Sequence, residues 1–81
     1  MNRDELRQRL RVMIAEFTNV PADQVAVNAS SQSIESWDSL AHMNLMVAIE
    51  QEFGIEFDDS EILGNKDLSA LVSLIEAKGG T

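Results

Sequence analysis

Three side chains capable of covalent or acid–base chemistry lie close together in the chain: Asp38, Ser39 and His42. These are the residue types of a hydrolytic triad, in which a histidine takes the proton of a serine nucleophile and an aspartate orients the histidine. Side chains on one helical turn radiate outward, however, and cannot line up in that way. His42 is the single histidine of the chain, and we interpret it as solvated or half-buried rather than as a base.

The rest of the sequence contains no other catalytic or metal-binding pattern. The absence of cysteine excludes a disulfide, a thiolate metal site and a cysteine nucleophile. The sequence also lacks an H-E-x-x-H zinc motif and a glycine-rich phosphate loop. A calcium-binding loop with Gly64 at its sixth position would place Leu63 and Ala70 at ligand positions, and neither side chain has an oxygen. We therefore expect a protein that is not an enzyme.

Ser39 has a second possible use, as the acceptor of a covalent group. It follows a polar loop and stands where a helix should begin, with Asp38 placed to cap that helix. Its hydroxyl should then face solvent, where a modifying enzyme could reach it without disturbing the core. A serine at a helix start is also common for structural reasons alone.

The spacing of apolar residues predicts four helices that would hold these residues. Three are long and one is short: they cover residues 3–18, 38–53, 58–63 and a last segment that begins near Asn65 or Asp67. Gly54 suits the left-handed end of the second helix, and Asp58 or Asp59 suits the start of the third. Residues 55–57 are too short to indicate a strand. The expected fold is an all-α, small four-helix bundle forming a single domain over residues 1–81.

A long polar loop, residues 25–37, joins the first two long helices. A loop of this length in a compact domain usually carries function or is disordered. We expect its apolar residues to fix it to the core; they are Val25, Val27, Ile34 and Trp37.

The second helix is apolar on two sides. One stripe consists of Leu45, Met46, Ile49 and Phe53, and the other of Leu40, Met43 and Val47. The first stripe should face the core. An exposed second stripe would indicate a partner site. Periodicity does not decide this, and burial of both stripes by neighbouring helices is the simpler interpretation.

The formal net charge of −8 is unevenly distributed. Residues 12–65 contain ten Asp and Glu and no Lys or Arg. Such a surface repels nucleic acid and anionic membranes, attracts basic protein partners and disfavours self-association. Acidity also serves solubility alone. Because the charged N-terminus has no apolar run and no segment is long enough to span a membrane, we expect a soluble, cytoplasmic monomer.

The motif Asp38-Ser39-Leu40, which opens an acidic and apolar helix in an acidic chain of 81 residues, resembles the acyl carrier proteins. The likeness runs from about Arg3 to Lys78 and includes AIEQEFGIEF at the end of the second helix and DDSEIL as the short third. In that family the serine is esterified with 4′-phosphopantetheine, and the thiol of this arm carries acyl groups as thioesters. The resemblance implies that Ser39 is the attachment site and that Asp38 assists the modification.

The resemblance also implies partners and a surface to bind them. Leu40, Met43, Val47 and Glu50 fall where carriers contact their enzymes. The implied partners are a phosphopantetheinyl transferase and acyl-activating, synthase or transferase enzymes with basic docking surfaces. These enzymes would belong to lipid, polyketide or related biosynthesis.

The sequence departs from the fatty-acid type of carrier at several positions. Trp37 replaces a small residue before the motif, and Ala41, His42 and Asn44 stand where acidic or small residues are frequent. Asn65 lies where an apolar residue often lines the acyl pocket. The form Ser-Trp-Asp-Ser-Leu is more similar to freestanding carriers of specialised pathways.

Two alternatives stay open at this level. An aminoacyl or D-alanyl carrier would have the same motif and charge. An acidic helical interaction domain without a prosthetic group would have the same composition, with the motif a coincidence.

Overall fold

A computed structural model describes residues 2–80, and the regular elements within them are helical apart from one isolated bridge between Ser30 and Asp67. The helices in chain order are α1 (Arg3–Thr18), the single 3₁₀ turn η1 (Ala22–Gln24), α2 (Ser39–Phe53), α3 (Asp59–Gly64) and α4 (Leu68–Ala77). This confirms the predicted all-α bundle of three main helices and one short helix, with a long loop before α2.

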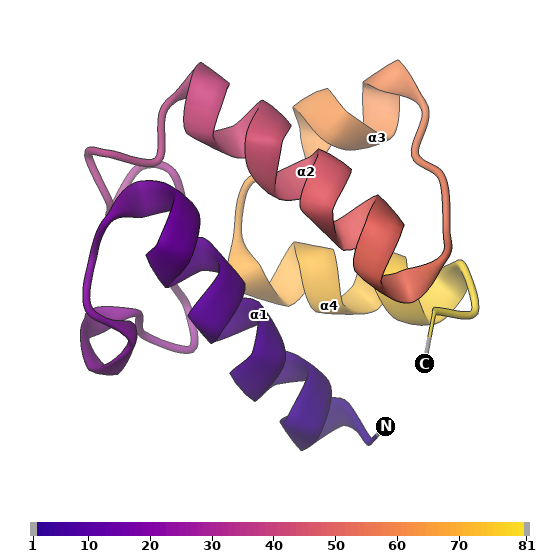
Figure 1. Cartoon of the computed structure of the whole chain (residues 1–81), viewed down its shortest axis with the longest axis horizontal. Helices are drawn as coiled ribbons and strands as arrows, with labels where there is room; N and C mark the ends of the chain where they lie inside the picture. Colours follow the sequence, from indigo (N-terminus) through magenta and orange to yellow (C-terminus); the bar gives the residue numbers. More distant parts are fainter. Residues whose placement is uncertain (1, 81) are drawn as a thin grey trace.

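The three long helices share one core, and α3 lies at the side (Figure 1). Helix α1 contacts both α2 and α4. Figure 1 shows α3 beside α2, on the side away from α1, and the long loop at the end of the bundle where α2 begins. This arrangement places the start of α2, with Ser39, next to the loop and close to α3.

Each α-helix begins with a side-chain cap, which satisfies backbone N–H groups that have no partner in the first turn. Asp38 Oδ1 accepts a hydrogen bond from the N–H of Ala41 at 2.9 Å, and Asp67 caps α4 in the same way. Asp58, rather than Asp59, caps α3, and Glu61 completes a capping box there. Helix α2 ends at Gly54 with φ of 67°, the left-handed conformation predicted for it.

The core lies between α1, α2 and α4. Its fully buried residues include the predicted face of α4 and most of the predicted face of α2: Leu6, Leu10, Ile14, Leu45, Met46, Ile49, Leu68, Leu71, Val72 and Ile75. Phe53 was expected in this set but is only partly buried. It is the last residue of α2 and packs at the rim of the core beside Gly80. A Cβ added to Gly80 would lie 3.2 Å from the Cβ of Phe53.

The long loop is fixed to the core by residues close to those predicted. Val25 and Trp37 are buried, and Ile34 packs against the core. Val27 is 57% exposed, so its predicted role is wrong, and Ala29 is the buried residue instead. The cause is a turn in which the N–H of Ala29 donates to the carbonyl of Ala26 at 3.0 Å, because this turn directs Val27 outward.

Candidate functional site

Ser39 is the first residue of α2, and its side chain is exposed. No hydrogen bond within residues 2–80 engages its hydroxyl, whereas the capping carboxylate of Asp38 beside it accepts the N–H of Ala41. A hydrogen bond holds the segment that precedes Ser39: Ser36 Oγ donates to the carbonyl of Thr18 at 2.6 Å. Because the segment before it is held in place and its hydroxyl is free, Ser39 Oγ can act as a nucleophile toward a group delivered from solvent.

Ser39 borders a small hollow of about 170 Å³. The other lining residues come from the long loop, the first turn of α2 and the segment before α4: Ser31, Trp37, Asp38, His42 and Lys66. The loop and the last segment are joined by two backbone hydrogen bonds, from Ser31 to the carbonyl of Lys66 and from Leu68 to the carbonyl of Ala29, both 2.9 Å long. The hollow is therefore part of the folded framework.

His42 is 2% exposed, so its interpretation as solvated or half-buried is wrong. The indole Nε1–H of Trp37 donates to His42 Nδ1 at 3.0 Å, and His42 Nε2 lies 2.7 Å from the carbonyl oxygen of Ile62. An indole N–H only donates and a carbonyl only accepts, so Nδ1 is unprotonated and Nε2 carries the proton. His42 is a neutral bridge from the loop to α3, and neither nitrogen is free to act as a base.

The pKa of His42 is lowered from its ordinary value. The largest cause is burial, which disfavours the charged ring. The carbonyl of Ile62 opposes this effect, and the nearby positive charge of Lys66 adds to it. The hydrogen-bonded bridge from Trp37 through His42 to Ile62 therefore favours the neutral form of the histidine.

The second apolar stripe of α2 is exposed, so the interpretation that both stripes are buried is wrong. Leu40, Met43 and Val47 are 72%, 45% and 47% exposed. Helix α1 packs on the other face of α2, whose buried residues belong to the common core, and the six residues of α3 are too few to cover this one. Glu50, at the end of the stripe, is half-buried, and its carboxylate accepts the N–H of Phe57 at 2.8 Å.

Helix α3 extends the exposed stripe. Leu63 is 66% exposed and shares a mostly apolar hollow of about 200 Å³ with Met43, Asp59 and Ile62. Neither Leu63 nor Lys66 was singled out as a site residue in the sequence. A six-residue helix has too few turns to show a periodic face, and Lys66 lies in the connection between α3 and α4. The available signal was Lys66 itself, a lone cation after a long acidic stretch.

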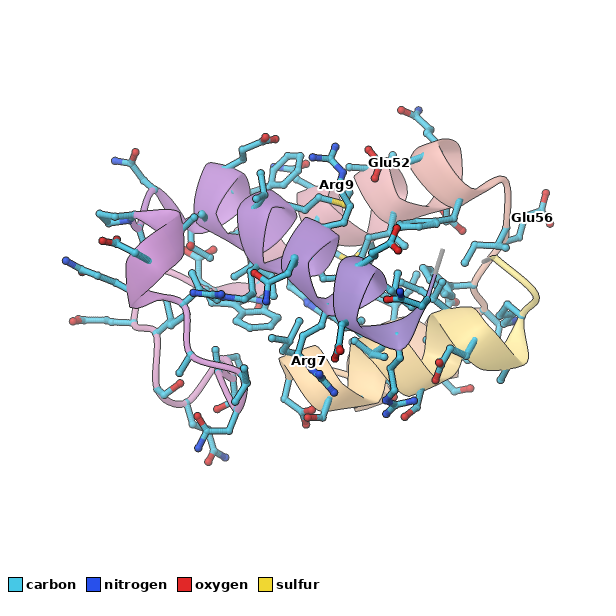
Figure 2. The ribbon with its side chains drawn as sticks, turned by 90° about the horizontal axis from the view of Figure 1, so that it is seen from below. Arg7, Arg9, Glu52 and Glu56 are labelled. Carbon is cyan, nitrogen blue, oxygen red and sulfur yellow. The ribbon has the colours of Figure 1, made fainter. Side chains whose placement is uncertain are left out.

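Three of the four arginines of α1 form ion pairs with carboxylates, and Arg11 donates to carbonyl oxygens instead. Figure 2 shows Arg9 of α1 pointing to Glu52 of α2, and the two side chains form an ion pair. Hydrogen bonding between them raises the pKa of Arg9 and lowers the pKa of Glu52. Arg7 pairs with Asp4 at 3.0 Å, within α1.

Comparison with known proteins identifies the family. The family model described as "Phosphopantetheine attachment site" matches residues 8–75. The acyl carrier protein of Petrotoga mobilis is 32% identical over 78 residues, which cover 96% of this chain and 92% of that protein. The chain belongs to the acyl carrier protein family.

Other members of the family are similarly close. The acyl carrier protein of Thermosynechococcus vestitus is 30% identical over 96% of both chains. That of Rickettsia typhi is 34% identical over 93% of this chain and 87% of its own length. Such proteins are carriers rather than catalysts, and the prosthetic group of this carrier is covalently attached 4′-phosphopantetheine.

An exposed serine with a free hydroxyl beside an open hollow fits an ester-linked prosthetic group. No hydrogen bond within residues 2–80 engages that hydroxyl, and Ser39 lies outside the core. None of the helices in this described part of the chain combines the length and apolar character needed to cross a membrane.

Proposed function

We propose that Ser39 is the residue esterified with 4′-phosphopantetheine, and that this protein presents acyl intermediates to enzymes of lipid, polyketide or related biosynthesis. The thiol of the prosthetic group holds each intermediate as a thioester. The observation that carries the proposal is the exposed, unpartnered hydroxyl of Ser39 at the start of α2, inside the region that matches the family.

The loading step forms one bond and breaks one. Ser39 Oγ bonds to the phosphorus of the phosphopantetheine half of coenzyme A, and the P–O bond to the adenosine 3′,5′-bisphosphate half breaks. The hydroxyl proton leaves to a base of the transferase. We assign Asp38 an assisting role, because its exposed carboxylate stands beside the hydroxyl and attracts the basic surface of a transferase.

The partner surface in this proposal comprises Leu40, Met43, Val47 and Glu50, all on α2. Three exposed apolar side chains provide a small contact area, and the surrounding carboxylates attract basic docking surfaces from a distance. A small apolar area limits affinity, so partners are released quickly. A carrier that visits several enzymes in turn needs both properties.

The central test is transfer of phosphopantetheine in vitro. The protein is incubated with coenzyme A, Mg²⁺ and a broad-specificity phosphopantetheinyl transferase, and its mass is measured. The wild type should gain one phosphopantetheine and Ser39→Ala should gain none. Ser69→Ala is the matched control, because Ser69 is also an exposed serine in the first turn of an Asp-capped helix. Loading of Ser39→Ala would show that another residue is the attachment site.

The cargo is tested separately, on protein isolated from its native host with the thioester preserved. We expect mass spectrometry to show an acyl group, in keeping with the names of the relatives. An amino acid on the thiol would instead support the aminoacyl or D-alanyl alternative. The alternative of a domain without a prosthetic group is set aside by the family match.

Association with the transferase should weaken as the salt concentration rises. The reason is the stretch of residues 12–65 without a positive charge, whose field is screened beyond about 8 Å at ~0.15 M salt. Stopped-flow association rates should fall steadily between low and high ionic strength. A rate that stays constant over this range would show that charge does not guide the encounter.

A further inference from the structure

Lys66 differs from the other basic residues in having no partner for its charge. Of the six Lys and Arg side chains, five form ion pairs or donate to carbonyl oxygens: Arg3, Arg7, Arg9, Arg11 and Lys78. Within residues 2–80, the ammonium group of Lys66 has neither an acidic partner nor a hydrogen bond. The side chain of Lys66 is partly buried, and its charge is free to pair with an anionic ligand.

The backbone holds Lys66 beside Ser39. Its carbonyl accepts the N–H of Ser31 at 2.9 Å, and the next residue, Asp67, forms the isolated bridge with Ser30. Lys66 and Ser39 consequently line the same hollow of about 170 Å³. The influence of the Lys66 charge on the buried ring of His42, in the wall of this hollow, agrees with that position.

An anion at this place would pair with the free charge of Lys66. The partners proposed above have basic docking surfaces, and Lys66 stands at the edge of the face that they would approach. A phosphodiester on Ser39 would bring a permanent negative charge to the hollow. Ammonium–phosphate contacts are charge-assisted and among the stronger hydrogen bonds in proteins. Asp38 repels the same phosphate, but its Oδ1 already accepts the N–H of Ala41.

We propose that Lys66 binds the phosphodiester of the prosthetic group attached to Ser39 and holds the root of the arm at the hollow lined by Trp37 and His42. This inference rests on the proposed function. Lys66 is a positioning residue for the arm and takes no part in forming or breaking a bond. Its pairing with phosphate also removes a repulsive charge from the docking face once the carrier has been loaded.

The experiment compares the loaded wild type with three loaded variants. Lys66→Met removes the charge, Lys66→Arg keeps it, and Lys78→Met removes a charge from a lysine that pairs with Glu61. Two resonances are recorded by NMR: the ³¹P signal of the phosphodiester and the ¹⁵Nζ signal of the Lys66 ammonium. Neither signal depends on the activity of any partner enzyme.

Loading should shift the Lys66 ¹⁵Nζ resonance and leave that of Lys78 in place. The ³¹P resonance of Lys66→Met should differ from that of the wild type, while Lys66→Arg and Lys78→Met should match the wild type. The difference should vanish near 1 M salt, where screening acts beyond about 3 Å.

Identical ³¹P resonances in the loaded wild type and Lys66→Met, with no ¹⁵Nζ shift on loading, would overturn this inference and leave the proposed function intact. A wild-type protein that gains no phosphopantetheine mass would overturn both.

Discussion

Replacing Ile49 by alanine is expected to lower the free energy of unfolding by about 2–5 kcal/mol. Ile49 has no exposed surface and lies in the middle of the core between α1, α2 and α4, so the smaller side chain leaves a cavity. A domain of this size has a total stability of roughly 5–15 kcal/mol, and the loss is a large part of it. Urea and thermal unfolding, followed by circular dichroism, measure the change.

Val47→Asp is the matched comparison on the opposite face of α2. Val47 is 47% exposed, so the substitution should cost well under about 1 kcal/mol and leave the melting temperature nearly unchanged. It should nevertheless slow the loading of Ser39, because a charge would enter the apolar part of the proposed partner contact. If Val47→Asp unfolds the protein as severely as Ile49→Ala, the exposed stripe has a structural role instead.

Phe53→Ala should fall between these two variants. Phe53 is partly buried at the rim of the core, so its removal opens a smaller cavity than the removal of a central residue. The same melts therefore rank the three positions by their burial.

Replacing His42 by leucine is the second substitution with a large expected effect. Leucine keeps much of the volume but leaves the indole N–H of Trp37 and the carbonyl of Ile62 without partners. Each unsatisfied buried group costs about 1–3 kcal/mol, so we expect the two together to cost about 2–6 kcal/mol. Glutamine offers one acceptor and one donor, and His42→Gln should recover part of the loss. Equal melting temperatures for His42→Leu and the wild type would show that the bridge adds nothing to stability.

The same bridge predicts how stability depends on pH. The unfolded chain protonates His42 near pH 6.5, whereas the folded pKa is lower. Between these two values the unfolded state binds more protons, so stability falls as the pH falls, by up to about 1.4 kcal/mol per pH unit. Unfolding curves measured from pH 7 to pH 5 should show this slope in the wild type and lose it in His42→Gln.

Carboxylates affect stability in a separate and more acidic range. Hydrogen bonding to Arg9 lowers the pKa of Glu52 from its ordinary value of 4.5, so its contribution is lost only as the pH falls below that value. The histidine slope is therefore observable before the ion pairs titrate.

Much of the fold was predictable because its signals are local. A cap such as Asp38 or Asp58 acts on the three residues that follow it, and Gly54 acts on one turn, so the helix ends can be found in short windows of sequence. The buried face of α4 repeats at helical spacing and was predicted completely. The motif at residues 38–40 and its family resemblance identified Ser39 as the candidate site.

What escaped prediction depends on how the long loop returns to the bundle. His42 is buried only because Trp37 and α3 close over it, and both lie outside its own helix. One turn at residues 26–29 exposes Val27, which was predicted to be buried, and buries Ala29 in its place. Lys66 reaches the hollow through backbone hydrogen bonds to residues more than thirty positions earlier in the chain. No periodic pattern encodes such contacts.

The hydrogen bond between Trp37 and His42 has a practical consequence, because Trp37 is the single tryptophan of the chain. Its indole lies in the wall of the hollow that borders Ser39, so the intrinsic fluorescence of the protein arises from a single position beside the candidate site. Protonation of His42, departure of α3 or arrival of an arm at the hollow would each change the surroundings of that one fluorophore. Loading and release could therefore be followed in real time by emission spectroscopy, without any attached label.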